Sequence, residues 1–101
     1  MVKREALEIA KKFLSSVSLH YSVKNAYLFG SYAKENPHAD SDIDVAIVLD
    51  QRQLTFNSEM ELVRLRREID LRIEPHTFLK NDFNESNPLA HEILKYGIRI
   101  V

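Results

Sequence analysis

The chain has 101 residues, of which 45% are hydrophobic and 29% are charged, and its formal net charge is -1. These values are close to those of ordinary soluble domains, which usually span about 50 to 250 residues, so we expect one globular domain over residues 1–101. The lack of a basic excess argues against stable nucleic-acid binding, and a sequence without cysteine has neither disulfides nor thiolate metal sites.

The first two predicted elements are a helix and a strand. Apolar residues recur at helical spacing over residues 4–17, with charged residues between them, and predict an amphipathic helix. Because this segment resembles neither a signal peptide nor a membrane span, we expect a cytoplasmic protein. Residues 23–29 predict a strand that ends at Gly30, and Ser31 suits a turn or a helix cap.

The middle of the chain predicts a loop, a strand, a helix and a second strand. Residues 34–41 are rich in turn formers, and residues 42–49, DIDVAIVL, predict a strand. Apolar residues among alternating charges predict a helix over residues 58–68. Residues 69–75, IDLRIEP, alternate between apolar and polar and predict a strand with one buried face.

The last segment predicts a polar loop at residues 80–86, a helix and a short final strand, IRIV. Asn87 can cap the helix, Pro88 suits its first position, and Gly97 can close it. The order of elements predicts an α/β (α+β) protein with a mixed sheet flanked by helices.

Asp42 and Asp44 are the first candidates for a chemical role. Residues two apart on a strand point to the same side, about 6.6 Å apart, so both carboxylates would face one spot. Two close carboxylates repel each other unless a cation neutralises them, and oxygen ligands of this kind suit Mg²⁺. The turn at Gly30 and Ser31 could present N–H groups and a hydroxyl to the phosphates of a metal-bound substrate.

Each of these features also has a purely structural interpretation. Asp42 could cap the loop, Asp44 could be a charge that protects a sheet edge, and the Gly-Ser pair could form an ordinary turn. The combination of Gly30-Ser31, ten residues and Asp-x-Asp is more specific than its parts. We expect surface or structural roles for the histidines, which lack metal-ligand spacing: His20, His38, His76 and His91.

The same residues resemble the signature of the DNA polymerase beta-like nucleotidyltransferase superfamily. The resemblance extends over nearly the whole chain, including the segments YLFGSYAK, SDIDVAIV, IDLRIEP and NPLAHEILKYGIRIV. Within the superfamily, the chain resembles the minimal nucleotidyltransferase group of the MntA type. This resemblance implies the nucleotidyltransferase fold. It also implies attack of an acceptor hydroxyl on the α-phosphorus of a nucleoside triphosphate, with pyrophosphate leaving.

The resemblance implies roles for particular residues. Gly30 and Ser31 would contact the nucleotide phosphates, and Asp42 and Asp44 would hold catalytic Mg²⁺. Asp70 fits the third acid of the family best and would share both metal binding and catalysis.

Two neighbours of Asp70 leave choices open. Glu74 lies on the same predicted face and is the alternative third acid. Arg72, between the two acids, either contacts phosphate or pairs with an acid, and we expect the pairing.

The partners are also implied by the resemblance. Members of the minimal group resemble antitoxins of helical HEPN proteins, with transfer of AMP from ATP to a tyrosine of that toxin as the implied activity. The alternative is a non-catalytic subunit that neutralises a partner by binding it. A homodimer through exposed strand edges is a further alternative for so small a domain.

Overall fold

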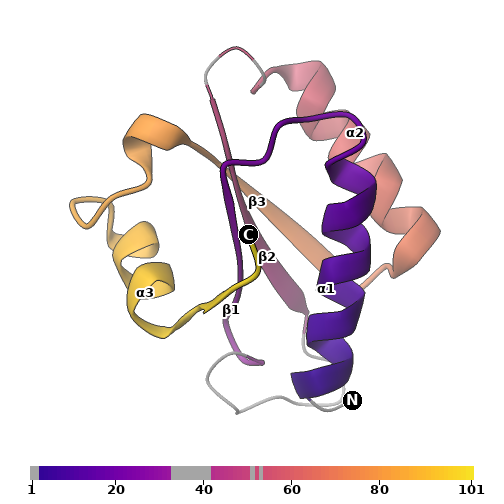
Figure 1. Cartoon of the computed structure of the whole chain (residues 1–101), viewed down its shortest axis with the longest axis horizontal. Coiled ribbons are helices and arrows are strands. Elements are labelled where there is room, and N and C mark those ends of the chain that lie inside the picture. The colour runs from indigo at the N-terminus through magenta and orange to yellow at the C-terminus, as the bar shows by residue number, and fades with distance from the viewer. Residues whose placement is uncertain (1–2, 33–41, 51, 53) are drawn as a thin grey trace.

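The computed structural model describes residues 3–32, 42–50, 52 and 54–101 (Figure 1). The loop predicted at residues 34–41 lies outside the described residues. The elements, in chain order, are α1 (Lys3–Val17), β1 (Asn25–Phe29), β2 (Ile43–Leu49), α2 (Phe56–Ile69), β3 (Ile73–Leu79), the 3₁₀-helix η1 (Lys80–Asp82), α3 (Pro88–Tyr96) and β4 (Ile98–Arg99).

The strands form one mixed four-stranded sheet in the order β3-β2-β1-β4. β1 is antiparallel to both β2 and β4, whereas β2 and β3 are parallel and are joined through α2. Helices α1 and α2 lie on one side of the sheet and α3 lies on the other, so the sheet is the middle layer (Figure 1). This arrangement confirms the predicted mixed sheet flanked by helices.

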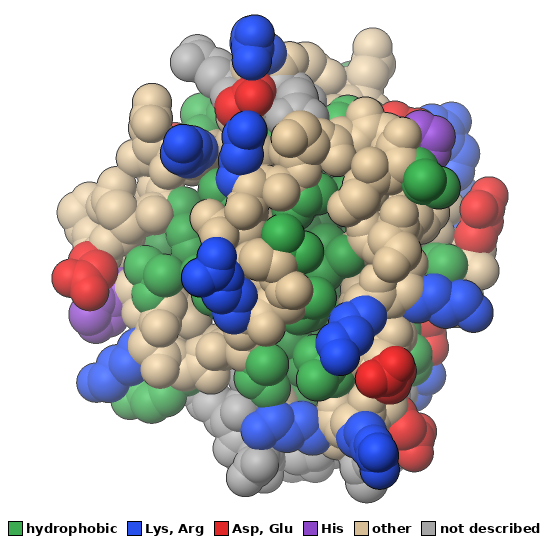
Figure 2. All heavy atoms as spheres, in the orientation of Figure 1, with side chains coloured by type: hydrophobic (Ala, Val, Ile, Leu, Met, Phe, Trp, Pro, Cys, Tyr) green, Lys and Arg blue, Asp and Glu red, His purple; other side chains and the backbone are tan. Residues whose placement is uncertain are grey.

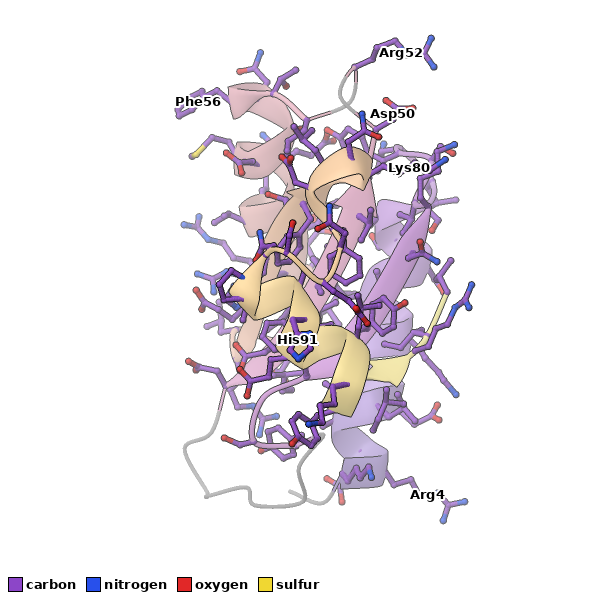
Figure 3. All side chains as sticks on the ribbon, turned by 90° about the vertical axis from the view of Figure 1, so that its left-hand side faces the viewer. Arg4, Asp50, Arg52, Phe56, Lys80 and His91 are labelled. Carbon is purple, nitrogen blue, oxygen red and sulfur yellow. The ribbon has the colours of Figure 1, made fainter. Side chains whose placement is uncertain are left out.

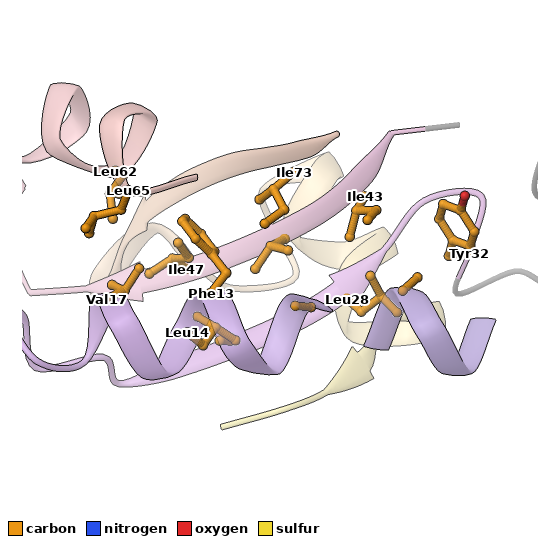
Figure 4. Packing of buried hydrophobic residues seen from close by; sticks show 14 of the residues in the cluster. Phe13, Leu14, Val17, Leu28, Tyr32, Ile43, Ile47, Leu62, Leu65 and Ile73 are labelled. Carbon is orange, nitrogen blue, oxygen red and sulfur yellow. The ribbon is translucent and has the colours of Figure 1, made fainter. Parts of the chain in front are cut away.

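The larger hydrophobic core lies between the sheet and the pair α1 and α2. Phe13 and Val17 of α1 are fully buried and face Ile47 of β2 and Leu62 of α2 (Figure 4). Full burial of each such side chain contributes about 1.5–3 kcal/mol relative to exposure. Tyr32, just after the turn at Gly30, is also fully buried in this core.

A smaller cluster lies on the opposite face of the sheet, beneath α3 (Figure 3). Asn87 caps α3 as predicted, because its side-chain oxygen accepts from the N–H groups of Leu89 and Ala90 at 3.0 and 3.1 Å. Gly97 ends the helix, with its N–H on the carbonyl oxygen of Ile93. The buried members of this cluster are Phe29, Ala46, Val48, Phe78 and Ile93.

Helix α2 begins two residues earlier than the sequence pattern predicted. Thr55 and Ser58 form a capping box, in which each side chain accepts from the backbone N–H of the other. The prediction relied on the spacing of buried apolar residues. That spacing does not indicate where a helix begins when its first residues are capping or exposed residues. Phe56, the first residue of α2, is indeed mostly exposed.

The strand predicted at residues 69–75 was wrong in its position. Ile69 is the last residue of α2, Asp70 caps the helix, and β3 runs from Ile73 to Leu79. The prediction was wrong because Ile69, Leu71 and Ile73 are spaced two apart, as in a strand, although Ile69 ends a helix and Ile73 begins the next strand. Pro75 fits within β3 because β3 is an edge strand of the sheet. Backbone N–H groups on the outer side of an edge strand have no neighbouring strand to donate to, so proline, which lacks an N–H, is tolerated there.

Smaller differences concern element ends. β1 begins at Asn25 rather than at residue 23, and β2 begins at Ile43, so Asp42 lies just before the strand. The segment predicted as a polar loop at residues 80–86 begins with η1. In the described part of the chain, no helix has both the length and the apolar character that crossing a membrane requires.

Candidate active site

Gly30 and Asp44 are packed directly against each other. Gly30 directly follows β1 and has a φ of +78°, a conformation that residues other than glycine rarely adopt. A Cβ atom at this position would lie 2.4 Å from Oδ2 of Asp44, well inside van der Waals contact. The glycine therefore serves both the turn and the approach of the carboxylate, which comes from the neighbouring strand in register with Phe29.

Asp42 and Asp44 differ in their surroundings. Asp44 lies within β2 and its side chain is 24% exposed, on the face of the sheet that α3 covers in part. Asp42 precedes β2 and is exposed. The structure therefore places Asp44 against the Gly30 turn. Asp42 is exposed to solvent just before the first residue of β2.

Glu74 is the carboxylate that the sheet places beside Asp44. The parallel register of β2 and β3 pairs Asp44 with Glu74, and paired residues share a face of the sheet. The Glu74 side chain is half exposed, and its Oε2 lies 3.7 Å from Nη1 of Arg66 on α2. The same Arg66 atom donates to the carbonyl oxygen of Ile73 at 2.9 Å, which fixes the guanidinium beside the strand.

Asp70 occupies a different setting, at the end of α2. Its carboxylate accepts two hydrogen bonds from the Arg72 guanidinium, at 2.9 and 2.6 Å, and one from the Arg72 backbone N–H at 2.9 Å. Hydrogen bonding to Arg72 is the main reason that the pKa of Asp70 is lowered. The expected pairing of Arg72 with an acid is confirmed, and Asp70 is held outside the strand that carries Glu74.

His76 also belongs to this site, although a surface or structural role was expected for it. Its Nε2 lies 3.1 Å from Oδ1 of Asp44, and it lies two residues beyond Glu74 on the same strand. A signal was present in the sequence, because Glu74 and His76 are two residues apart and would share a face of a strand. That signal was missed because the strand was placed too early in the chain.

The described side chains do not form a ready-made metal cage. Among residues 3–32, 42–50, 52 and 54–101, no group of three or more potential ligands is arranged to hold a metal ion. Asp44 is turned toward His76 and Glu74 toward Arg66. The chemistry of the donors nevertheless suits Mg²⁺, which is usually held by one or two carboxylates together with substrate phosphates and water rather than by an all-protein cage.

A hollow of the surface lies away from these acids. In the view of Figure 2, apolar side chains gather in the middle of the face, between α3 and α1. A shallow groove of about 380 Å³ is lined by Lys11, Leu14, Ser15, Ser18, Ile100 and Val101. Because its lining contains no carboxylate side chain, the groove is not the site of the chemistry that Asp44 and Glu74 suggest.

The family comparison agrees with this geometry. Residues 10–101 match the family described as polymerase beta, nucleotidyltransferase. The chain belongs to this family. The match covers the Gly30 turn, Asp42, β2 with Asp44 and β3 with Glu74, so the nucleotidyltransferase class predicted from the sequence is confirmed.

One relative supports the assignment at the level of sequence. A candidate protein adenylyltransferase of Methanocaldococcus jannaschii, MJ1379, is 33% identical over 66 residues. The alignment spans 64% of this nucleotidyltransferase and 66% of the relative. The chain therefore spans just under two thirds of the relative's length.

Solved structures share the fold. A candidate nucleotidyltransferase from Sulfolobus solfataricus superposes with a TM-score of 0.67 at 20% identity, covering 96% of this chain and 80% of that one. A toxin–antitoxin complex with AMP-PNP superposes with a TM-score of 0.62 at 21% identity, covering 88% of this chain and 70% of that one. A mutant of the toxin–antitoxin pair MntA–HpeT gives 0.56 at 17% identity, with coverages of 98% and 72%.

Proposed function

We propose that this nucleotidyltransferase is a Mg²⁺-dependent enzyme that transfers AMP from ATP to a hydroxyl group of a partner protein. The observation that carries the proposal is the packing of Asp44 against Gly30, with Glu74 in register on the next strand. A chain that only bound a partner would not need a glycine with positive φ whose missing side chain makes room for a carboxylate.

The proposed roles follow the geometry of the described residues. Gly30 and Ser31 present the turn to the triphosphate, since a backbone without a side chain at Gly30 allows close approach. Asp42 and Asp44 hold Mg²⁺, which when bound neutralises phosphate charge and orients the reacting oxygens. For the third acid we favour Glu74 over Asp70, because Glu74 is paired with Asp44 in the sheet and Asp70 is engaged by Arg72.

The reaction is an in-line substitution at phosphorus. The acceptor hydroxyl oxygen forms a bond to the α-phosphorus, and the bond from that phosphorus to the α–β bridging oxygen breaks. Pyrophosphate leaves with the electron pair of the broken bond, and Glu74 accepts the hydroxyl proton. Glu74 has to turn away from Arg66 for this role, and a separation of 3.7 Å with a half-exposed carboxylate indicates a weak ion pair.

The proposed acceptor is a tyrosine of a helical toxin of the HEPN type, which makes this chain an antitoxin that acts in the cytoplasm. Two facts support this part of the proposal. The relative from M. jannaschii is described as a candidate protein adenylyltransferase, and two structural neighbours are toxin–antitoxin complexes, one of them with AMP-PNP.

The test is incubation with ATP and Mg²⁺ in the presence of the protein encoded by the neighbouring gene, followed by peptide mass spectrometry. We expect one tyrosine of the partner to gain AMP, with Asp44→Asn as the inactive control. A stable complex in which no residue of either protein gains AMP would replace the proposal with the alternative, a subunit that neutralises its partner by binding alone.

A further inference from the structure

The contact between His76 and Asp44 fixes one oxygen of the proposed metal ligand. A carboxylate can only accept, so the imidazole Nε2 carries the proton in its 3.1 Å contact with Oδ1 of Asp44. The other oxygen, Oδ2, is the atom that approaches Gly30. One oxygen of Asp44 is thus occupied by a hydrogen bond, and the other is turned toward the proposed phosphate turn.

The His76 ring is itself held in place from across the sheet. Its centroid lies 4.9 Å from that of Phe29, in an edge-to-face arrangement with an interplanar angle of 67°. His76 is on β3 and Phe29 is on β1, and the strand between them places Ala46 in register with His76. The small Ala46 side chain leaves room for the imidazole to lie over β2 and reach both Phe29 and Asp44.

The environment strengthens this hydrogen bond. The side chains of His76 and Asp44 are 33% and 24% exposed, and Phe29 is buried. A hydrogen bond to a charged group that is partly shielded from water contributes more than an exposed one. Metal-ligating carboxylates are commonly fixed by such outer partners, and loss of the partner weakens metal binding about 10- to 100-fold.

We propose that His76 is a positioning residue that donates from Nε2 to Oδ1 of Asp44 and so leaves Oδ2, which faces the Gly30 turn, as the oxygen that would hold Mg²⁺. The inference rests on the proposed function, since it gives His76 a task only if Asp44 holds a metal. It assigns a role to a histidine outside the acidic motif. The alternative is a purely structural role, in which the His76 ring only packs against Phe29.

Two substitutions separate the roles of the donor and of the ring. His76→Phe keeps an aromatic ring against Phe29 but removes the N–H donor. His76→Gln loses the ring, but its amide nitrogen lies about as far from the backbone as the imidazole Nε2 and can donate to Asp44. His91→Phe is the matched control, because His91 is an exposed histidine on α3 (Figure 3).

The first measurement is Mn²⁺ affinity by electron paramagnetic resonance, in the presence of an ATP analogue whose α–β bridge cannot be cleaved. We expect His76→Phe to bind Mn²⁺ about tenfold more weakly or worse, and His76→Gln to recover most of the affinity. His91→Phe should match the native protein. Thermal unfolding measured in parallel shows whether any loss merely reflects a damaged fold.

The second measurement needs neither metal nor activity. Nitrogen NMR of the histidine rings, at a pH at which they are neutral, should show His76 in the tautomer with the proton on Nε2. Asp44→Ala should shift that resonance, while Asp82→Asn on η1 should not.

The proposal is overturned if His76→Phe binds Mn²⁺ as well as the native protein, or if His76→Gln loses as much affinity as His76→Phe. It is also overturned if the native protein binds no Mn²⁺ with the analogue, since Asp44 then has no metal to hold. Failure of AMP transfer alone, with the Mn²⁺ and tautomer results as expected, would refute the proposed acceptor chemistry and leave the role of His76 intact.

Discussion

Asp44 on β2 and Glu74 on β3 are paired across two parallel strands, so the sheet itself holds two carboxylates on one face beside the turn at Gly30. This relationship depends on backbone hydrogen bonds rather than on side-chain choice. It explains how so short a chain positions acids from segments thirty residues apart.

Asp44→Asn should abolish transfer and leave the fold intact. The amide loses the negative charge that the proposed metal needs, yet it keeps the size of the carboxylate and an oxygen that can accept from His76. We expect at least about a hundredfold loss of AMP transfer, equivalent to about 2.7 kcal/mol of transition-state stabilisation. Circular dichroism and thermal unfolding should match the native protein, and retention of transfer would refute the metal role of Asp44.

A comparison of Glu74→Gln with Asp70→Asn identifies the third acid. Glu74→Gln should reduce transfer by about a hundredfold or more, because it removes the proposed proton acceptor beside Asp44. Asp70→Asn should retain transfer but lower the midpoint of thermal unfolding, since it weakens the pairing with Arg72 at the end of α2. The reverse pattern in a transfer assay would restore Asp70 as the third acid.

Gly30→Ala and Gly97→Ala should differ in their effect on activity, although both substitutions add strain to the fold. At Gly30 the new Cβ meets the end of the Asp44 side chain at 2.4 Å, and that carboxylate can swing away, so transfer should be lost. The positive φ adds strain of about 1–3 kcal/mol.

At Gly97 the new Cβ meets the backbone carbonyl oxygen of Ile93 at 2.5 Å, which cannot move without disturbing α3. Gly97→Ala should therefore lower stability and retain transfer when assayed well below its unfolding temperature. Equal loss of transfer in the two variants would show that the packing of Gly30 on Asp44 has no special importance.

Tyr21 should make the fold sensitive to alkaline pH. Burial, together with the hydrogen bond that its hydroxyl donates to Glu61, raises the pKa of Tyr21 to about 12. The folded-state pKa is above the unfolded value of about 10, so this contribution is fully present below pH 10 and is lost as the pH rises toward 12.

The Tyr21 contribution is measured by urea unfolding across that pH range. Tyr21→Phe should show a shallower loss of stability between pH 10 and 12 than the native protein. Tyr96→Phe is the control, because the ring of Tyr96 is half exposed on α3. If Tyr21→Phe and the native protein lost the same free energy of unfolding between pH 10 and 12, the proposed effect of Tyr21 would be contradicted.

The sequence was sufficient to predict a mixed sheet and the helices that flank it. Short-range signals carry both: helical periodicity over α1, Asn87 and Gly97 at the ends of α3, and a continuous apolar run through β2. These signals depend on neighbours in the chain, which a sequence displays directly.

The choice of third acid depends on a long-range relationship, which the sequence does not display. Alternation alone could not show that α2 extends to Ile69, so the strand that follows was placed about four residues early. Only the register of β3 against β2 pairs Glu74 with Asp44 and brings His76 to the same carboxylate. The pairing of the strands therefore favours Glu74 over Asp70 and accounts for the contact of His76 with Asp44.

The measurement that tests the central claim most directly compares two forms of labelled ATP, one with the label at the α-phosphate and one at the γ-phosphate. The protein is incubated with each form, Mg²⁺ and its partner, and covalently bound label is measured on denatured protein. We predict incorporation from the α-labelled form alone, lost in Asp44→Asn. Incorporation from the γ-labelled form, or from neither form despite a stable complex with the partner, would contradict the account.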